Sequence, residues 1–326
     1  MEASVKKIVL ISPKFFNLSD LIKDEIVRQG YDCHWFNDRI SDRFIDKVLL
    51  RINKKAIQKK IDRYFEEISE YCIKEQPDIL LTIYGQSFTG EQFAKLKEKL
   101  PNTEFVFFSW DSADIYPIIK GKFPVFDRSY TFDTVDVDKY HVHFLPLFYS
   151  YKDSQEPIAY DYSFIGTIKP GKYQVIHELT TQLNKHFSKS YVYMFLQSPK
   201  AYHYYRLKSR EFRHAKKKEF RYDRLDAKTV NTIFLQSNII VDVAMANQNG
   251  LTIRTLDALH LKKKLITNNT NIRKYPFYNE KNILVYEGGE LNFDSPFFTE
   301  PFDETSALSH DYSIEHFVHV LLGVQE

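Results

Sequence analysis

The stretch NIIVDVAMANQNGLTIRTLDALHLKKKLIT, residues 238–267, decides the fold of this chain. It opens with a mostly apolar run of strand length, 239–243, and a polar turn rich in asparagine follows at 247–250. A segment with helical periodicity, 251–262, then leads into a second short apolar run, 265–267. The order strand, turn, helix, strand predicts a parallel α/β unit, because two parallel strands need a crossover between them and it is usually a helix.

Two polar residues of the helical segment are candidates to bind an anion. Ile253, Leu256 and Leu259 recur every three residues and are expected to face the sheet. Arg254 and Asp257 lie on another face, near the helix N-terminus, where unpaired N–H groups and a partial positive charge favour anions. An arginine there adds charge-assisted hydrogen bonds to a diphosphate. The alternative is an ordinary surface ion pair between Arg254 and Asp257.

The same segment carries a family resemblance. Residues 250–269, GLTIRTLDALHLKKKLITNN, resemble the donor-binding motif of GT-B glycosyltransferases, especially bacterial lipopolysaccharide- and capsule-locus proteins of the CgeB-like group. Many retaining enzymes of that fold carry two acidic residues here, separated by seven others. Asn249 and Asp257 stand at those two places, so an amide replaces the first acid. The resemblance implies an α/β protein with two Rossmann-like domains facing a central cleft, the second of which binds a nucleotide-sugar donor.

Composition narrows the class of protein. A length of 326 residues suggests two domains, and 43% hydrophobic with 27% charged residues is ordinary for a soluble globular protein. The net charge of +2 is too small to predict nucleic-acid binding by itself. Cys33 and Cys72 are the only cysteines and give no disulfide framework, which fits a reducing cytoplasm. No apolar stretch approaches the roughly 18 residues that a membrane-spanning helix needs.

Alternating apolar and helical segments predict one Rossmann-like domain over residues 1–150 and a second over 151–302. The resemblance assigns the acceptor to the first domain and implies that a C-terminal helix within 303–326 packs back on it. A helix-rich stretch is expected at 42–75. Strands of the first domain are predicted at 5–12, 31–36, 78–84, 104–110, 124–132 and 142–148.

A glycine-containing loop of the second domain adds to the candidate donor site, because ligands of open α/β sheets gather at the carboxyl ends of strands. It holds Gly166 and Thr167, with Lys172 beyond, where glycine permits close approach and lysine suits phosphate. A plain strand-to-helix turn is an equally good interpretation. The candidate donor-binding residues are Gly166, Thr167, Lys172, Asn249, Gly250, Leu251, Thr252, Arg254 and Asp257.

Two polar loops of the first domain follow apolar strands. Asp111 is a candidate general base for an acceptor hydroxyl, although an Asp after a strand is also a common helix cap. The small loop at Tyr84 and Gln86 is a candidate to hold sugar hydroxyls, and a simple turn is the alternative. Catalysis is therefore assigned to Asp111 and Arg254, and acceptor binding to Tyr84, Gln86, Trp110 and Asp114.

No metal and no cofactor are predicted, since the nucleotide sugar is a substrate. Asp136 and Asp138 match the short acidic motif of metal-dependent GT-A enzymes, but so short a pattern occurs by chance and this domain has another architecture. His141 and His143 are spaced to share a strand face, yet no Cys or further His follows at ligand spacing. The absence of GxGxxG, Walker A and GxSxG patterns argues against dinucleotide oxidoreductases, P-loop NTPases and a nucleophile elbow.

Positive charge is concentrated in residues 206–224, RLKSREFRHAKKKEFRYDR. Nine Lys or Arg and three Asp or Glu give this stretch a local charge of +6. A solvated helix face is the default interpretation. The alternatives are an anionic membrane surface with a lipid-linked acceptor and, ranked last, a nucleic acid. No nucleic-acid partner is predicted, since no recognition helix, RNP pattern or zinc finger accompanies the stretch.

These features and the resemblance together predict a metal-independent glycosyltransferase. It would move a sugar from a nucleotide-sugar donor to a hydroxyl of a bacterial surface glycan, which is lipopolysaccharide, capsule or exopolysaccharide. Arg254, Lys172 and a helix N-terminus at Gly250 would neutralise the leaving diphosphate. The expected location is the cytoplasm, peripheral to the inner face of the membrane. The alternatives are a nucleotide-sugar epimerase of the same fold and a non-catalytic envelope- or glycan-assembly protein, which the amide at Asn249 keeps open.

Overall fold

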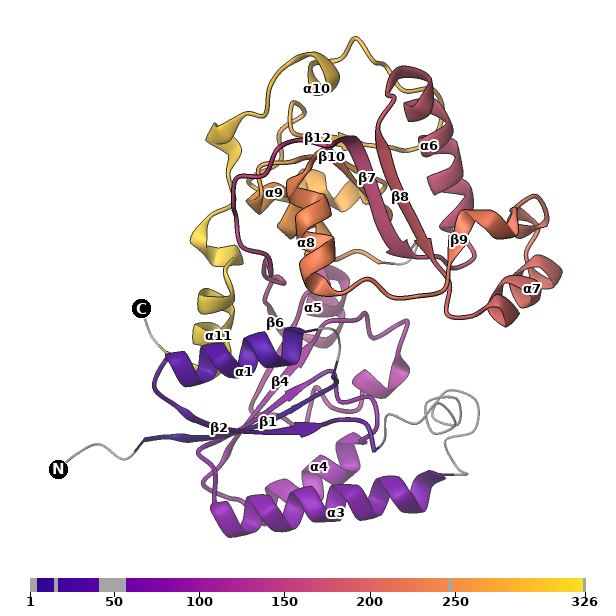
Figure 1. The fold of residues 1–326 in the computed structure, drawn as a ribbon. Coiled ribbons are helices and arrows are strands. Elements are labelled where there is room, and N and C mark those ends of the chain that lie inside the picture. Colours follow the sequence, from indigo (N-terminus) through magenta and orange to yellow (C-terminus); the bar gives the residue numbers. More distant parts are fainter. Residues whose placement is uncertain (1–4, 15–16, 41–56, 246–247, 325–326) are drawn as a thin grey trace. The chain divides into compact units, whose positions relative to one another are not determined.

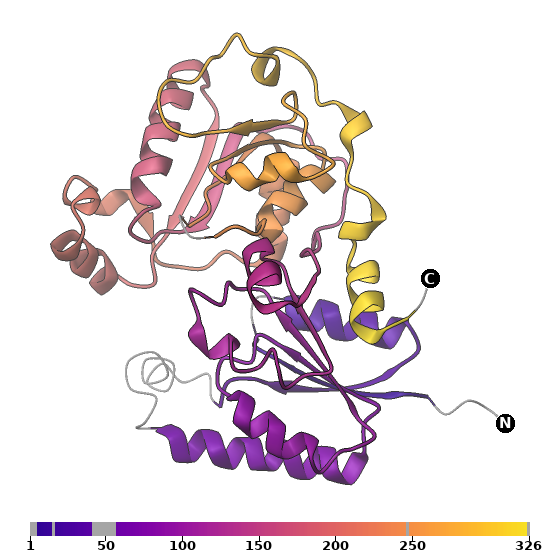
Figure 2. The ribbon, with the colours of Figure 1, turned by 180° about the vertical axis from the view of Figure 1, so that it is seen from behind.

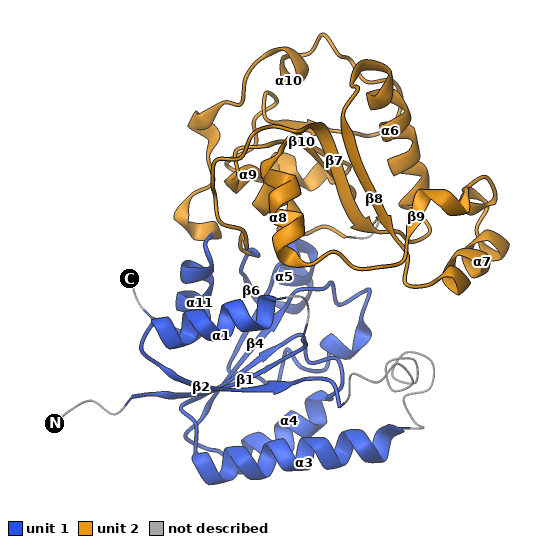
Figure 3. Cartoon of the chain, viewed as in Figure 1, with its two compact units in different colours: residues 1–147, 313–326 blue, residues 148–312 orange. Residues whose placement is uncertain are grey.

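The protein folds into two compact units, shown in different colours in Figure 3. The computed structural model describes residues 5–14, 17–40, 57–245 and 248–324. The first unit comprises Met1–Leu147 together with Ser313–Glu326, and the second comprises Phe148–Tyr312. Part of the expected helix-rich stretch, 42–56, and Asn247 of the predicted turn lie outside the described residues.

The first unit is built on a six-stranded sheet whose order is β2-β1-β3-β4-β5-β6, with every neighbouring pair parallel. All residues of β3 are buried, as expected for a parallel strand that is covered on both faces. The strands are β1 (Lys7–Ser12), β2 (Asp32–Asn37), β3 (Ile79–Ile83), β4 (Glu104–Ser109), β5 (Arg128–Thr131) and β6 (His143–Phe144).

Helices cover both faces of this sheet. Helices α1 and α11 lie side by side on one face, and α3 and α4 cover the other (Figures 1 and 2). The ring of Phe317 packs edge-on against Phe108 with 4.8 Å between centroids, and the carbonyl of Val320 accepts a 2.9 Å hydrogen bond from Arg128. The helices are α1 (Leu18–Arg28), α3 (Gln58–Glu75), α4 (Gly90–Lys97), α5 (Thr134–Tyr140) and α11 (Ile314–Leu322).

Helix α5 lies between two strands that were expected from the sequence and that are both shorter than expected. Strand β5 occupies only part of 124–132, and β6 holds only two residues of 142–148. Asp133 caps α5 by accepting a hydrogen bond from the N–H of Val135. His141 is the C-cap of α5 with φ 54°, so the expected strand face shared by the two histidines is wrong.

The short acidic motif lies in α5, where Asp136 is buried and Asp138 is exposed. Asp136 is buried and accepts a 2.7 Å hydrogen bond from the N–H of Ala113. Burial and the nearby charge of Asp133 raise the pKa of Asp136 against the effect of that hydrogen bond. Among the described residues, no group of three or more His, Cys, Asp or Glu side chains is placed to hold a metal.

The second unit is built on a six-stranded sheet, again parallel throughout, in the order β9-β8-β7-β10-β11-β12. This is the strand order of the Rossmann fold, in which the winding reverses between the first strand, here β7, and the fourth, here β10. The strands are β7 (Tyr160–Thr167), β8 (Ser190–Phe195), β9 (Phe220–Arg221), β10 (Ser237–Asp242), β11 (Lys264–Thr267) and β12 (Ile283–Val285).

The predicted strand–helix–strand unit of 238–267 is confirmed as β10, α9 and β11. Alternate residues of β10 face opposite sides of the sheet. Ile239 and Val241 share a hydrophobic core with Ile176 of α6, whereas Asp242 faces α9. Leu256 of α9 is buried as expected. The helices of this unit are α6 (Tyr173–His186), α7 (Pro199–Lys208), α8 (Ala227–Leu235), α9 (Ile253–His260) and α10 (Pro296–Thr299).

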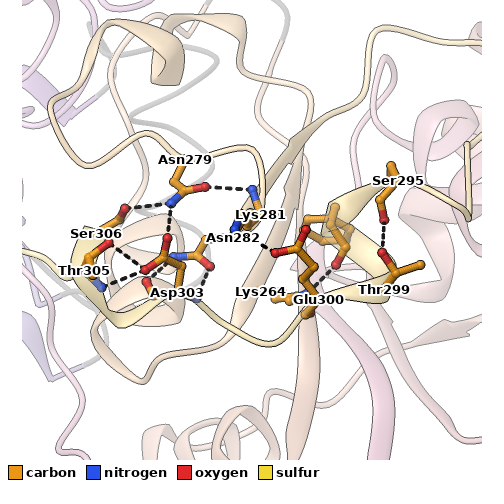
Figure 4. Close-up of polar contacts among 11 residues, drawn as sticks. Lys264, Asn279, Lys281, Asn282, Ser295, Thr299, Glu300, Asp303, Thr305 and Ser306 are labelled. Carbon is orange, nitrogen blue, oxygen red and sulfur yellow. Dashed lines mark hydrogen bonds and ion pairs between the residues drawn. The ribbon is translucent and has the colours of Figure 1, made fainter.

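A polar network fixes the chain that follows β12 (Figure 4). The side-chain amide of Asn279 donates to the carboxylate of Asp303 at 2.9 Å. Asn282 and Asp303 exchange two hydrogen bonds, one from the amide to the carbonyl of Asp303 at 2.8 Å and one back to the amide oxygen at 2.7 Å. Lys281 pairs with Glu300 at 2.7 Å. This network holds residues up to Ser306 on the β11–β12 side of the second unit.

Candidate functional site

The carboxyl ends of β7 and β10, where the winding of the second sheet reverses, bring together one carboxylate and two cations. Asp242, the last residue of β10, is only 1% exposed. Its Oδ1 accepts a 3.0 Å hydrogen bond from Nε of Arg254. Its Oδ2 accepts hydrogen bonds from the hydroxyl of Thr255, at 2.9 Å, and from that of Thr252. Lys172, the N-cap residue of α6, interacts electrostatically with Asp242 and Arg254.

The sequence positions these groups through the start of α9. The hydroxyl of Thr252 caps the helix by accepting a 3.2 Å hydrogen bond from the N–H of Thr255, and it also donates to Asp242. Burial favours the neutral form of Asp242, but the charge of Arg254 and the hydrogen bond from Thr252 hold the pKa of this carboxyl below its ordinary value. Asp242 is therefore a buried anion whose hydrogen-bonding capacity is satisfied within the protein.

Arg254 is held along one edge of its guanidinium. In the described part of the chain, Asp242 is its only hydrogen-bond partner, through Nε. The side chain of Arg254 is 34% exposed, so its terminal amino groups are accessible to a ligand. One carboxylate faces two cations, which leaves the cluster with an excess positive charge. A guanidinium fixed in this way matches the oxygen spacing of a phosphate, which it binds through two parallel hydrogen bonds.

Lys172 is the second cation of the cluster. Burial and the neighbouring charge of Arg254 lower the pKa of Lys172 to about 8. The preceding residue, Gly171, has φ 91° and donates its N–H to the carboxylate of Glu211, which fixes the loop between β7 and α6. A lysine whose charge is destabilised at a ligand-binding edge of a sheet is typical of a functional site.

The lowered pKa of Lys172 predicts a pH dependence. The affinity for a nucleoside diphosphate should fall as pH rises through about 8 and beyond, because Lys172 loses its proton there. Replacing Lys172 with methionine should weaken binding about tenfold at neutral pH, the effect of one charge-assisted hydrogen bond. Isothermal titration at several pH values, with whichever nucleoside diphosphate stabilises the protein most, measures both effects. A variant that keeps the wild-type pH profile would show that Lys172 does not contact the ligand.

The two earlier residues of the candidate glycine loop lie in the strand itself. Gly166 is part of β7, not of the loop after it, which corrects the expectation. A side chain at Gly166 would come within 2.9 Å of the ring of Phe164, so the glycine there makes room for that ring. Thr167 is the exposed last residue of β7, at the carboxyl end where Lys172 also lies.

The loop before α9 is fixed by a residue that the sequence analysis missed. The side-chain amide of Asn269 donates to the carbonyls of Asn249 and Gly250, at 3.3 and 3.1 Å. Leu251 is buried, so its side chain is not accessible to a ligand. The N-cap of α9 is Thr252, and the expected helix N-terminus at Gly250 is therefore wrong.

Asp257 binds the protein's own chain. Its Oδ1 accepts hydrogen bonds from the N–H groups of Ser150, at 2.6 Å, and Tyr151, at 3.2 Å, and the hydroxyl of Ser150 reaches both carboxylate oxygens. Burial raises the pKa of Asp257 to about 7 in spite of these hydrogen bonds. The structure thus corrects the expectation that Asp257 faces the same ligand as Arg254. The alternative surface ion pair is wrong as well, since Arg254 pairs with Asp242.

In the first unit, three candidate residues meet after β3 and β4. The rings of Tyr84 and Trp110 stack with 6.0 Å between centroids. Burial and the nearby charge of Asp111 raise the pKa of Tyr84, while Asp111 itself is half-buried. Tyr84 and Gly85 both have positive φ, 68° and 56°, which makes the turn after β3 sharp and strained. The N–H of Gln86 donates to Asp38 at 2.7 Å.

Three lysines lie near this turn. Two of them pair with Asp114, and the third is buried against the turn itself. Asp114 is exposed and pairs with Lys139 at 2.9 Å and Lys120 at 3.0 Å, which lowers its pKa and occupies its carboxylate. Lys122, which the sequence analysis missed, is fully buried, and its ammonium donates to the carbonyls of Tyr84, at 3.3 Å, and of the following glycine. Through these hydrogen bonds Lys122 stabilises the strained turn.

Comparison with known proteins gives structural matches only. No protein-family model matches the chain, and no curated protein sequence does. The OtsA apo structure is similar over 98% of this chain and 100% of that chain, with TM-score 0.62 and 9% identity. The apo lipopolysaccharide outer core galactosyltransferase WaaB covers 97% and 95%, with TM-score 0.51 and 14% identity.

An epimerase shares the same fold. The UDP-GlcNAc 2-epimerase of Methanocaldococcus jannaschii, in complex with UDP-GlcNAc and UDP, matches 98% of this chain and 100% of that chain, with TM-score 0.56 and 10% identity. At such low identity these similarities establish the fold alone. The chain therefore has the GT-B fold of two Rossmann-like units.

Proposed function

We propose that the protein is a glycosyltransferase that moves a sugar from a nucleotide-sugar donor to a hydroxyl of a bacterial surface glycan. The observation that carries this proposal is the cluster of Lys172, Asp242 and Arg254 at the reversal of the second sheet. Proteins of this fold have been solved with UDP-glucose, and with UDP-GlcNAc and UDP. A diphosphate is the part of such ligands that two clustered cations would recognise.

The proposed chemistry is stabilisation of the leaving diphosphate. Negative charge grows on the diphosphate as its bond to the anomeric carbon breaks, and Arg254 and Lys172 neutralise it. Because Asp242 already orients Arg254, little reorganisation is needed during the reaction, which is the condition for a large electrostatic effect. Asp111 remains the proposed base that accepts the proton of the acceptor hydroxyl. Trp110, Tyr84 and Gln86 are proposed to contact the acceptor.

We expect the reaction to be independent of a divalent metal. The two cations and the helix start at Thr252 supply the positive charge that a metal would otherwise bring to the diphosphate. Turnover measured after dialysis against EDTA should equal that of untreated protein. Loss of activity that Mn²⁺ restores would contradict this expectation and would require carboxylate ligands for the ion.

The reaction is proposed to take place in the cytoplasm, at the inner face of the membrane, where lipid-linked acceptors are exposed. None of the described helices is long and apolar enough to cross a membrane.

A nucleotide-sugar epimerase is the second candidate, because an epimerase of this fold matches nearly the whole chain. Product analysis separates the two. Purified protein is incubated with a panel of nucleotide sugars, with and without glycan acceptors. A transferase releases nucleoside diphosphate and extends the acceptor, whereas an epimerase interconverts two nucleotide sugars without any acceptor. Absence of both products, together with no nucleotide binding, would favour a non-catalytic assembly protein.

A further inference from the structure

The basic stretch 206–224 forms a projection on the second unit. Helix α7 and the chain leading to β9 extend from the β9 edge of the sheet (Figures 1 and 2). The stretch covers the end of α7, two short 3₁₀ turns at Glu211–Arg213 and Lys217–Glu219, and β9. The default interpretation of one solvated helix face is therefore wrong. All nine Lys and Arg side chains of the stretch are exposed.

Two of the three acidic residues in the stretch face inward. Glu211 accepts hydrogen bonds from the backbone N–H groups of Gly171 and Gln174. Glu219 accepts a 2.7 Å hydrogen bond from the hydroxyl of Tyr173 and a 3.1 Å bond from the N–H of Lys216. These carboxylates fix the projection to the loop before α6 and to the helix itself.

The basic side chains of this stretch differ from the other cations on the described surface. Elsewhere on the surface, lysines pair with carboxylates, as Lys95 does with Glu91 at 2.7 Å and Lys97 with Asp127 at 2.6 Å. Within the described residues, none of the nine Lys and Arg of 206–224 pairs with a carboxylate. Arg221 donates only to nearby carbonyls, and Arg224 lies 5.6 Å from the centroid of a phenylalanine ring. The projection thus carries a concentrated charge that no carboxylate of the described residues neutralises in an ion pair.

Apolar side chains are exposed on the outer face of α7. Leu207 is 82% exposed and Tyr204 is 58% exposed, and their spacing of three residues puts them on one face of the helix. The opposite face holds Tyr202, which is buried and donates a 3.0 Å hydrogen bond to the carbonyl of Ala215. Tyr204 contacts only the edge of the core through the ring of Tyr205, at 5.7 Å between centroids in the described structure, and most of the surface of Leu207 is exposed.

We propose that this docking surface, made of Tyr204, Leu207 and the basic residues of 206–224, binds an anionic phospholipid bilayer. Cations beside the helix attract the lipid headgroups, and the two apolar side chains enter the interface. A nucleic acid fits less well, because bases stack on aromatic rings and Leu207, the most exposed side chain beside Tyr204, is aliphatic. The phenylalanines of the stretch, Phe212 and Phe220, are buried in the core of the unit. The proposal does not depend on the transfer reaction.

Vesicle co-sedimentation tests the proposal. Full-length protein is mixed with vesicles of phosphatidylglycerol and phosphatidylcholine in equal parts, or of phosphatidylcholine alone, at low and high salt. Wild type should bind the anionic vesicles at low salt and bind them much less at high salt. Replacing Lys216, Lys217 and Lys218 with glutamine should weaken binding about 100-fold at low salt, since each basic residue near the surface contributes about fivefold.

Two further variants make the test specific. Replacing Lys185, Lys189 and Lys228 with glutamine removes the same charge from exposed sites of the same unit outside the docking surface, and should leave binding nearly unchanged. Replacing Leu207 with serine should abolish the binding that remains at high salt. Wild type that fails to sediment with anionic vesicles at low salt overturns the proposal. Equal effects of the two triple variants, or tighter binding to a single-stranded oligonucleotide than to the vesicles, also overturn it.

Discussion

Replacing Arg254 with alanine should lower the rate of sugar transfer by a factor of about 10² to 10³. The factor corresponds to the roughly 3–4 kcal/mol that one preorganised donor contributes to the stabilisation of a developing anion. Arg254 is suited to this role because Asp242 fixes its Nε and leaves the rest of the guanidinium accessible. The turnover number and the Michaelis constant, measured with the donor found by the panel, give the size of the effect.

One control variant and one stability measurement separate this effect from damage to the fold. Arg273 is an exposed arginine of the same unit that pairs with Glu287 on the surface, so its replacement by alanine should change the rate little. The alanine variant at Arg254 should unfold at lower denaturant concentration, because Asp242 loses its partner. The free energy of unfolding should fall by less than the roughly 3–5 kcal/mol that removing one partner of a fully buried ion pair costs, since Arg254 is partly exposed. Normal turnover of this variant would refute the role of Arg254.

Replacing Asp242 with alanine should affect both stability and transfer. The change leaves Arg254 and Lys172 without their shared carboxylate and removes the acceptor of two threonine hydroxyls. We expect the free energy of unfolding to fall by about 3 kcal/mol or more, and transfer to fall at least 100-fold because Arg254 is no longer oriented. Urea denaturation and initial rates measure the two losses separately.

The asparagine variant at the same position separates the loss of charge from the loss of the hydrogen-bond acceptor. Asp242→Asn keeps an oxygen that accepts from the threonines but removes the charge, so its stability should lie between those of wild type and the alanine variant. The pKa of Lys172 should fall further, because the charge of Asp242 raises it. The exposed N-cap residue Asp226 provides a matched control, and its asparagine variant should change stability by less than about 0.5 kcal/mol. An alanine variant at Asp242 with wild-type stability and rate would contradict the assignment.

The fold was predictable where one local pattern decides the structure. Residues 238–267 alternate strand, turn and helix within one stretch, and the structure confirms β10, α9 and β11 there. Helix α5 was not predicted, because its sequence, TVDVDKY, has only 7 residues and carries two β-branched valines, which weaken a helical signal. The side chain of Asp133 that caps it decides the outcome, and such a cap is a weak signal next to predicted strands.

The site was only partly predictable because its parts are joined by packing. Arg254 and Lys172 were identified from their places after strands, and their proximity to one another is a property of the strand order. Asp242 was included in the predicted strand 239–243, and an acidic residue within such an apolar run is the signal that would have identified it. Asp257 was assigned to a ligand because the sequence does not show that Ser150 lies against it.

Lys122 shows the same limit in the first unit. A lysine in a loop is expected to be solvated, yet this one is fully buried beneath the turn after β3. Its position depends on how the chain between β4 and β5 packs, for which the sequence carries no periodic pattern.

The most direct measurement is the stabilisation of the protein by nucleotides that differ only in their phosphates. Unfolding is followed for wild type and for Arg254→Lys with a nucleoside, its monophosphate and its diphosphate, for each of the common bases. One diphosphate should stabilise wild type by about 2.7 kcal/mol at a hundred times its dissociation constant. The nucleoside at the same concentration should stabilise it far less. In the lysine variant, the diphosphate should stabilise the protein little more than the monophosphate does, because lysine cannot make the bidentate contact. A nucleoside that stabilises wild type as strongly as its diphosphate would contradict binding of the diphosphate at Lys172 and Arg254.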